Sequence, residues 1–222
     1  TTRTATSITC CCPATTARRG RNGGILAERA SRPVAAVLLA AGLSRRFGRN
    51  KLLHLIDGRP MLRRVAENLV AALLPQDEVV VVLGHQAEAV RAALDGLPVR
   101  CIVNENYADG MGASIAAGVS GIGDKAAGVM IMLGDMPWIG AGQIRVLRAA
   151  FDRAAADAVV LPVHQGRRGH PVIFSRRWFP ALCALRGDRG ARSVLDAAGN
   201  DVIEVAMPDD GILRDLDQPD AV

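Results

Sequence analysis

The sequence predicts an α/β domain in which helices cover both faces of a mostly parallel sheet. Three observations predict this class. Strand-like runs alternate with helix-like runs, several strand-like runs are apolar throughout, and 222 residues suffice for one sizeable core. Half of the residues are hydrophobic but only 3% are aromatic, so the core has to be built from Val, Leu, Ile and Ala.

The first half of the predicted domain opens on the apolar run 34–40, which has the length of a strand. Residues 60–74 carry apolar side chains at helical spacing and begin with Pro60, which the first turn of a helix tolerates. Residues 78–83 read EVVVVL, a run typical of a strand that is buried on both faces. The remaining elements of this half are the helix 86–94, the strand 99–103, the loop 104–112 and the helix 113–120.

The second half continues the alternation, which is typical of a doubly wound, Rossmann-like sheet. Residues 162–171, PVHQGRRGHP, depart from it with charge and glycine between two extended runs, which predicts a lid or a substrate hairpin. The elements of this half are the strand 128–133, the helix 141–155, the extended runs 158–163 and 171–174, the helices 176–185 and 190–198, and the strand 202–206.

The positive charge of the chain is confined to residues 1–33. This segment holds six arginines against one acid, whereas residues 34–222 hold 21 basic and 21 acidic residues and are neutral. The domain, which we expect to span residues 34–222, therefore has no basic bias that would favour nucleic acid. We expect residues 1–33 to be a disordered basic extension, because they lack hydrophobic periodicity and the apolar core of a secretory signal.

The cysteines and the hydropathy pattern indicate a cytoplasmic protein outside the membrane. Cys10, Cys11 and Cys12 are consecutive, while Cys101 and Cys183 are isolated. Five cysteines without a C-x-x-C pair indicate neither a zinc site nor a disulfide framework, and a reducing compartment fits best. No apolar run approaches the roughly 20 residues of a membrane-spanning helix.

The candidate site begins where the first strand ends, in LAAGLSRRFGRNK at residues 39–51. The segment concentrates three arginines and a lysine without an acid, as a polyphosphate site requires. It contains neither a P-loop nor a dinucleotide fingerprint. Ala40, Ala41 and Gly42 are small enough for a base or ribose to approach the backbone, and Arg46 and Lys51 are spaced to reach phosphates. Spacing alone favours a solvated turn equally.

The pattern L-A-A-G-x-S-x-R-x-G-x-x-K resembles the signature of the molybdopterin nucleotidyltransferases and of related sugar- and methylerythritol-phosphate nucleotidyltransferases. Five further motifs resemble this family in the same order: GMGAS at 110–114, LGDMP at 133–137, GHP at 169–171, GDRGAR at 187–192 and DLDQP at 215–219. Together they cover nearly everything from residue 34 onward. The sequence most resembles the molybdenum cofactor cytidylyltransferase branch. Phe47 departs from the usual methionine, and Gln218 replaces a usual threonine.

The resemblance implies a fold of the nucleotide-diphospho-sugar transferase type and a set of site residues. It implies Lys51, Arg46 and Asp135 as catalytic groups, and Mg²⁺, or alternatively Mn²⁺, bound by Asp135 and Asp217. Asp215 is the alternative second acid, and from spacing alone Asp135 could equally cap the helix near residue 140. The implied nucleotide contacts are Leu39, Ala40, Ala41, Gly42, Lys51, Gly112 and Ser114, and the implied acceptor contacts are His170, Asp188 and Arg192. Ser114 could equally be a helix-start residue, and the nearby arginines could be surface charge.

The resemblance also implies a reaction, the transfer of a cytidylyl group from CTP to molybdopterin with release of pyrophosphate. Cytidylyltransferases of this family usually carry A-A-G where the guanylyltransferases carry A-G-G, so Ala41 favours CTP. A molybdenum hydroxylase would receive the product. Three alternatives remain: a guanylyltransferase or other small-molecule-phosphate nucleotidyltransferase, a nucleotide-dependent oxidoreductase on the same fold, and a non-catalytic maturation partner of a molybdenum hydroxylase.

Overall fold

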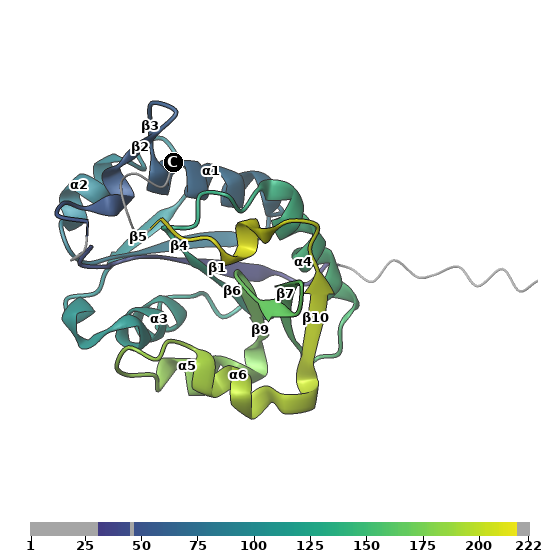
Figure 1. Ribbon diagram of the computed structural model, residues 1–222. Helices are drawn as coiled ribbons and strands as arrows, with labels where there is room; N and C mark the ends of the chain where they lie inside the picture. Colours follow the sequence, from purple (N-terminus) through teal and green to yellow (C-terminus); the bar gives the residue numbers. More distant parts are fainter. Residues whose placement is uncertain (1–30, 45–46, 217–222) are drawn as a thin grey trace, which may run out of the picture.

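The central sheet follows the strand order β10-β7-β9-β6-β1-β4-β5, with β8 paired to β7 (Figure 1). The computed structural model describes residues 31–44 and 47–216. The strands are β1 (Val34–Ala40), β4 (Glu78–Leu83), β5 (Arg100–Val103), β6 (Gly128–Leu133), β7 (Val159–His164), β8 (Arg167–Arg168), β9 (Val172–Ser175) and β10 (Val202–Ala206).

Most neighbouring strands of this sheet are parallel, as the sequence predicts. Strand β1 pairs in parallel with β4 on one side and β6 on the other. Strands β4 and β5 are parallel, and so are β7 and β10. The exceptions are β9, which runs antiparallel to both β6 and β7, and the short β8, which turns back along β7. The strand order reverses beside β1, and ligands of open α/β sheets bind at this kind of position.

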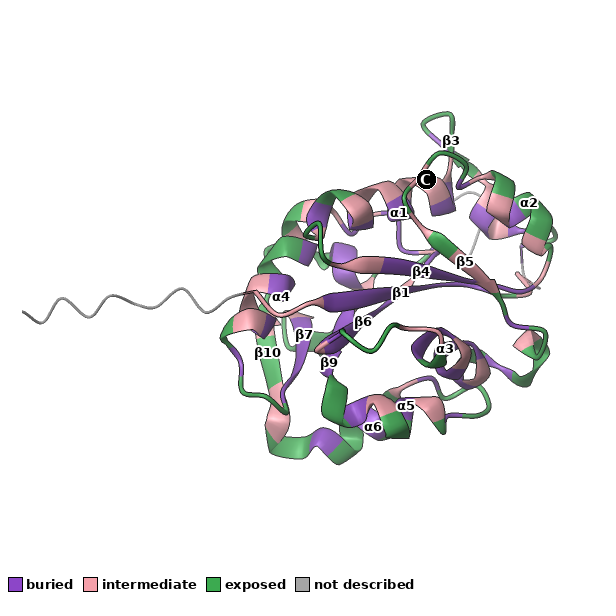
Figure 2. Ribbon diagram, turned by 180° about the vertical axis from the view of Figure 1, so that it is seen from behind, coloured by how far each residue is buried: buried purple, intermediate pink, exposed green. Residues whose placement is uncertain are grey.

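Helices cover the sheet on both faces (Figures 1 and 2). One face carries α1 (Met61–Ala72), α2 (Ala87–Ala92) and α4 (Ala141–Arg153), and the other carries α3 (Met111–Ser120), α5 (Phe179–Cys183) and α6 (Arg192–Ala198). The side chains of β1 alternate between the two cores. Leu38 belongs to the cluster that includes Met61 and Leu147, whereas Val37 belongs to the cluster that includes Ile115 and Leu182. This alternation explains why the strand is apolar throughout.

Several elements differ from the expectation at their ends. Helix α3 begins at Met111, two residues before the expected start, and the loop ahead of it contains the 3₁₀ turn η2 (Tyr107–Asp109). The hairpin of β2 (Leu55–Ile56) and β3 (Arg59–Pro60) and the 3₁₀ turn η1 (Lys51–Leu53) were not predicted from the sequence. The region expected as helix 176–185 is the 3₁₀ turn η3 (Arg176–Trp178) followed by α5, and η4 (Gly199–Asp201) precedes β10. The hairpin expected within 162–171 is present as the β7–β8 pair.

A buried charge network joins the described start of the chain to the domain. The Arg148 side chain is 4% exposed and bonds Asp77, whose side chain is fully buried, at 3.2 Å and Asp152 at 2.6 Å. Ser31 Oγ donates to Asp152 at 2.8 Å, and the Arg32 backbone N–H donates to the same carboxylate at 3.1 Å. Ser31 and Arg32, the first described residues, therefore contact the domain. No helix within residues 31–44 and 47–216 is long and apolar enough to cross a membrane.

Candidate functional site

A cavity of about 340 Å³ opens at the carboxyl ends of β1 and β6, where the strand order reverses. The segment after β1 contributes Ala41, Gly42 and Lys51 to its wall, and the segment after β6 contributes Asp135. The cavity therefore lies where parallel α/β sheets hold their ligands. Its full lining is Leu39, Ala41, Gly42, Leu43, Ser44, Lys51, Leu52, Tyr107, Ala108, Gly110, Met111, Ser114, Leu133, Asp135 and Asp188.

Lys51 and Asp135 form an ion pair in this cavity. Lys51 Nζ lies 2.7 Å from Asp135 Oδ2, and the two side chains are 17% and 19% exposed. Local structure fixes both ends of the pair. Ser44 Oγ accepts from the Lys51 backbone N–H at 3.1 Å, and Gly134 N–H donates to the Leu39 carbonyl at 2.9 Å. The second carboxylate oxygen of Asp135, Oδ1, is buried without a hydrogen-bond partner among the described residues.

Asp135 does not cap the next helix, which was the alternative that spacing left open. Helix α4 begins after Gly140, and the Gly140 N–H donates to the side-chain oxygen of Gln143 at 2.8 Å. The Asp135 carboxylate faces Lys51 and the cavity instead. A helix-cap role therefore gives no account of this acid.

A carboxylate that lines a cavity and keeps one oxygen without a partner among the described residues suits a hard divalent cation. Mg²⁺ takes oxygen ligands and is commonly held by one or two carboxylates together with substrate phosphates and water. The donor set of Asp135 fits this pattern, although no group of three His, Cys, Asp or Glu side chains gathers within the described residues. Arg46 and Asp217, the predicted partners of Lys51 and Asp135, lie outside the described residues. Asp215 is exposed, and the adjacent Leu216 N–H donates to the Asp135 carbonyl at 3.0 Å.

Residues that follow three neighbouring strands of the sheet pack together beside the cavity, and two of them, Ala41 and Tyr107, line it. Ala41 follows β1, Gly84 follows β4 and Tyr107 follows β5. A Cβ at Gly84 would lie 2.7 Å from Tyr107 Cβ and 2.8 Å from Ala41 Cβ, so glycine is required for this packing. Ser114 also faces the cavity, where its hydroxyl accepts from Asn104 Nδ2 at 3.1 Å. Sequence reasoning missed Tyr107 and Asn104, whose only signal is their place just after a strand.

Two of the sequence motifs meet beside this wall. The Gly112 N–H donates to the Gly187 carbonyl at 2.8 Å, and a Cβ at Gly110 would lie 2.3 Å from Asp188 Oδ1. GMGAS and GDRGAR therefore form one surface, although 75 residues separate Gly112 from Gly187. The Gly112 N–H already donates to a carbonyl of the protein, and Asp188 borders the first cavity.

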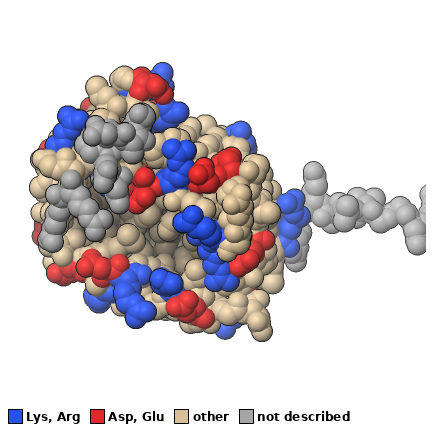
Figure 3. All heavy atoms as spheres, viewed as in Figure 1, with Lys and Arg blue, Asp and Glu red and all other residues tan. Residues whose placement is uncertain are grey.

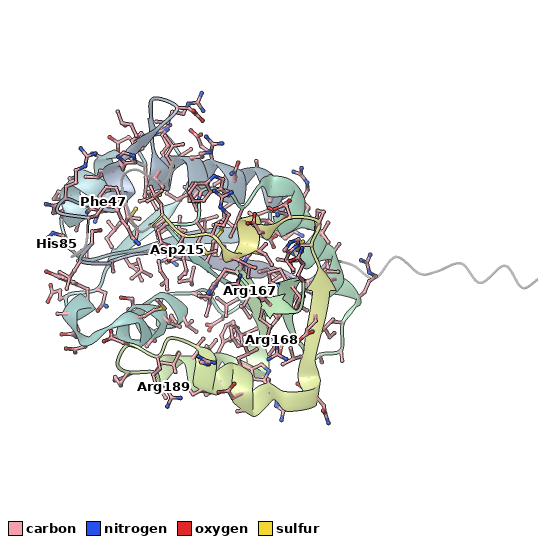
Figure 4. All side chains as sticks on the ribbon, in the orientation of Figure 1. Phe47, His85, Arg167, Arg168, Arg189 and Asp215 are labelled. Atoms are coloured by element: carbon pink, nitrogen blue, oxygen red, sulfur yellow. The ribbon has the colours of Figure 1, made fainter. Side chains whose placement is uncertain are left out.

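A second cavity of about 450 Å³ adjoins the first, and both are lined by Met111 and Leu133. Its interior is apolar, with Ile115, Ile131, Leu161, Val172, Phe174 and Leu195. Three arginines and Asp196 are among its lining residues, and Figure 3 shows Lys and Arg, interspersed with Asp and Glu, around the hollow on this face. Figure 4 places Arg168 on the β7–β8 hairpin and Arg189 on the segment before α6. An apolar interior with a basic border suits an anion that carries an apolar or flat body.

His170 and Arg192, two of the predicted acceptor contacts, line this second cavity. Burial lowers the pKa of His170 below its ordinary value, while the negative charge of Asp135 and a hydrogen bond to the Ile131 backbone oppose the shift. His170 Nδ1 is buried without a partner among the described residues. Burial therefore favours the neutral form of this imidazole, which lines the second cavity.

The predicted nucleotide contacts divide between the cavity and its support. Leu39, Ala41, Gly42, Lys51 and Ser114 line the first cavity. Ala40 is 1% exposed, belongs to the core on the α1 and α4 face and does not line the first cavity. Gly112 supports the cavity wall through Gly187.

Comparison with known proteins places this geometry in a family. Residues 36–202 match the family described as the MobA-like NTP transferase domain. Nicotine blue oxidoreductase of Paenarthrobacter nicotinovorans is 33% identical over 174 residues, which cover 73% of this chain and 81% of that protein. The bifunctional protein GlmU of Desulfotalea psychrophila is 33% identical over 146 residues, and the match spans 65% of this chain but only 41% of that protein.

Solved structures agree with this placement. Rv0371c from Mycobacterium tuberculosis H37Rv superimposes with a TM-score of 0.70 at 27% identity, covering 80% of this chain and 89% of that one. A structure of Rv0371c in complex with manganese gives a TM-score of 0.67 at 25% identity, covering 79% and 88%. Because the family match extends over most of the α/β domain, the chain belongs to the MobA-like NTP transferase family.

Proposed function

We propose that the protein is a cytidylyltransferase that transfers the cytidylyl group of CTP to a phosphate of a molybdopterin-type acceptor. The observation that carries the proposal is the ion pair of Lys51 with Asp135, which lines the cavity at the switch point and whose Oδ1 is buried without a partner among the described residues. Transfer of a nucleotidyl group needs a cation for the phosphates and a carboxylate for a divalent metal. Hydride transfer needs neither.

The residues divide the chemistry between them. The acceptor phosphate oxygen forms a bond to the α-phosphorus of CTP, the bond from that phosphorus to the bridging oxygen breaks, and pyrophosphate leaves. Lys51, together with Arg46, would stabilise charge on the β- and γ-phosphates, and Asp135 would hold Mg²⁺ with Asp217 or Asp215. The metal would neutralise charge on the phosphate oxygens. A phosphate is already a nucleophile at neutral pH, so positioning rather than a general base is required.

The two cavities receive the two substrates in this proposal. The first, with Ala41, Gly42 and Ser114, takes the nucleotide, and the methyl group of Ala41 favours CTP. The second, with His170 and Arg192, takes the acceptor. Asp188 borders the first cavity, so any contact that it makes to the acceptor would come from the nucleotide side. The five thiols of the chain fit the cytoplasm, where a molybdenum hydroxylase would receive the product.

An oxidoreductase is the second candidate, and one observation favours it. A relative that is 33% identical over 81% of its own length is named nicotine blue oxidoreductase. Fold and family do not fix the chemistry of a site. A guanylyltransferase and a non-catalytic maturation partner are the remaining candidates.

Pyrophosphate release separates these candidates. The purified chain is incubated with each of the four NTPs, with Mg²⁺ or Mn²⁺, and with or without molybdopterin. We expect release that requires CTP, metal and acceptor. Release with GTP, metal and acceptor, but not with CTP, would indicate the guanylyltransferase. A parallel incubation with reduced nicotinamide nucleotide and nicotine blue tests the oxidoreductase, and activity there without pyrophosphate release would overturn the proposed function. Inactivity in both assays would leave the maturation partner.

A further inference from the structure

The segment 207–216, which follows β10, crosses the carboxyl ends of the central strands, and we call it the C-terminal strap (Figure 1, yellow). At its start the Met207 N–H donates to the Val163 carbonyl of β7 at 2.8 Å. At its end the Leu216 N–H donates to the Asp135 carbonyl, just after β6, at 3.0 Å. The strap therefore spans from the outer part of the sheet to the candidate site.

The strap forms hydrogen bonds with the main chains of two residues, and each of these residues has a buried side-chain atom without a partner among the described residues. Leu216 bonds Asp135, and the Ile212 carbonyl accepts from the His170 N–H at 3.0 Å. Asp135 Oδ1 and His170 Nδ1 are both buried without a partner among the described residues. Asp135 lines the first cavity and His170 lines the second. One short segment is thus hydrogen-bonded to the main chain of one residue in each cavity.

Packing fixes the strap in place. Ile212 and Leu216 are fully buried. The Arg214 guanidinium lies 4.4 Å from the centre of the Trp138 ring, and Trp138 follows Asp135 by three residues. A Cβ at Gly211 would lie 2.8 Å from the Trp138 carbonyl oxygen. The strap and the segment after β6 are therefore packed as one unit.

The contact with the acceptor side depends on Gly169. A Cβ at Gly169 would lie 2.3 Å from the Ile212 carbonyl oxygen, which accepts from the next residue, His170. Any larger residue at this position has to push the strap away from the hairpin. The sequence GHP therefore has a physical reason for its glycine besides any contact with a ligand.

We propose that the C-terminal strap positions Asp135 and His170 relative to each other and so couples the acceptor cavity to the metal and nucleotide cavity. The inference rests on the proposed function, in which the two substrates have to meet between these cavities. Reacting atoms have to approach to about 3–3.5 Å, so a small displacement of one cavity against the other has a large effect. A change at the acceptor end of the strap then alters metal binding at Asp135.

Gly169→Ala tests this coupling with a readout other than turnover. The dissociation constant of Mn²⁺ is measured by electron paramagnetic resonance, with and without CTP, and the unfolding midpoint is recorded alongside. Gly169 lines the second cavity and not the first, so an effect confined to the second cavity leaves the Mn²⁺ constant unchanged. Coupling through the strap is expected to weaken Mn²⁺ binding at least about fivefold, the lower end of typical coupling between sites.

A matched control and a second variant make the result specific. Gly142→Ala places a methyl group in open space on α4 and is expected to keep the wild-type Mn²⁺ constant. Arg214→Gln removes the guanidinium from Trp138 without opening a cavity, because Arg214 is exposed, and is expected to weaken Mn²⁺ binding in the same direction as Gly169→Ala.

The outcomes separate the inference from the function on which it rests. If the wild type binds no Mn²⁺, the proposed metal site fails, and the strap inference fails with it. If the wild type binds Mn²⁺ and both strap variants bind it equally well while remaining folded, the strap inference alone is overturned. Weakened binding in both strap variants, with an unchanged Gly142→Ala control, supports it.

Discussion

Lys51 Nζ and Asp135 Oδ2 lie 2.7 Å apart, although the two residues follow different strands and are separated by 84 positions. Both side chains are less than one-fifth exposed, so the pair sits where charges interact more strongly than in bulk water. The ammonium compensates the carboxylate when no metal is bound. In the proposed reaction each group faces a part of the metal–triphosphate complex, and each is then a sensitive site for mutation.

Asp135→Asn is expected to lower turnover by at least about two orders of magnitude while leaving the fold intact. The substitution keeps the shape of the side chain but removes the charge that would hold the metal, and deletion of one electrostatic stabiliser typically costs on this scale. The measurement is the rate of pyrophosphate release at saturating CTP and metal. Asp124→Asn, at a fully exposed acid, is the matched control and should behave as wild type. Wild-type turnover in Asp135→Asn would refute the metal assignment.

The sheet was predictable because the apolar composition of most of its strands indicates that they are buried. Residues 34–40, 78–83, 128–133 and 202–206 form strands over the expected ranges, and the first three are apolar runs that are largely buried. The β2–β3 hairpin was missed because each strand has only two residues, although Asp57-Gly58 between them is a typical turn pair. The antiparallel direction of β9 was also missed, because direction leaves no mark in a short apolar run.

The location of the candidate site was predictable where a sequence motif directly follows a strand. Ala41 and Asp135 follow strands and therefore meet at one edge of the sheet, as expected. The contact of Gly112 with Gly187 and the reach of the strap to Asp135 depend on long-range packing that no local pattern encodes. Ile212 and Leu216 give only a weak signal, two apolar residues in a polar segment.

Arg148→Met is expected to destabilise the fold by about 3–5 kcal/mol, because it leaves the fully buried Asp77 carboxylate without its cation. Asp77 also accepts from the Val34 N–H at 2.8 Å, so the loss reaches the start of β1. The measurement is the free energy of unfolding in urea. Arg145→Met, at an exposed arginine of the same helix, is the control, with an expected change within about 0.5 kcal/mol. Equal stabilities of the two variants would contradict the role of the network.

The boundary of the domain can be located by two truncations. Removing residues 1–30 keeps the contacts of Ser31 and Arg32 with Asp152, whereas removing residues 1–33 deletes them. We expect the shorter truncation to match the full chain in stability and the longer one to lose about 1–3 kcal/mol, the cost of hydrogen bonds to a charged group. Both should retain activity, and both should have a pI closer to neutrality. Thermal unfolding distinguishes the two, and loss of folding in the shorter truncation would refute the expected extension.

The stability that Asp152 contributes is expected to depend on pH. Burial raises the pKa of Asp152, but hydrogen bonds from Arg148, Ser31 and the Arg32 backbone outweigh it and lower the pKa below the ordinary 3.8. The unfolded chain then binds the proton more readily than the folded protein, so this contribution is present above pH 3.8 and is lost as the pH falls below it. Wild type should therefore exceed Asp152→Asn in stability at pH 7, and the difference should shrink at lower pH. A difference that stays constant from pH 7 to pH 3 would contradict the lowered pKa.

Base choice is expected to depend on the wall that Ala41 shares with Tyr107. Ala41 is 5% exposed, and its methyl group and the Tyr107 Cβ both border the space above Gly84. Cytosine is a single ring, and a methyl group at this wall occupies space that the larger guanine requires. Ala41 and Tyr107 both pack closely at Gly84, so neither residue can move away from the cavity without displacing the other.

Wild type is therefore expected to prefer CTP over GTP by at least about tenfold in kcat/KM, since a methyl-sized steric difference supplies about 1–3 kcal/mol. Ala41→Gly should narrow this preference mainly by admitting GTP. The change should be incomplete, because Ser114 and Tyr107 still border the nucleotide cavity.

Ala40→Gly is the matched control: it removes a methyl group one residue earlier, from the core on the opposite face, and should lower stability without altering the preference. The measurement is kcat/KM for both nucleotides with one acceptor at fixed Mg²⁺. Equal use of the two nucleotides by the wild type would refute the cytidylyl assignment and leave nucleotidyl transfer standing.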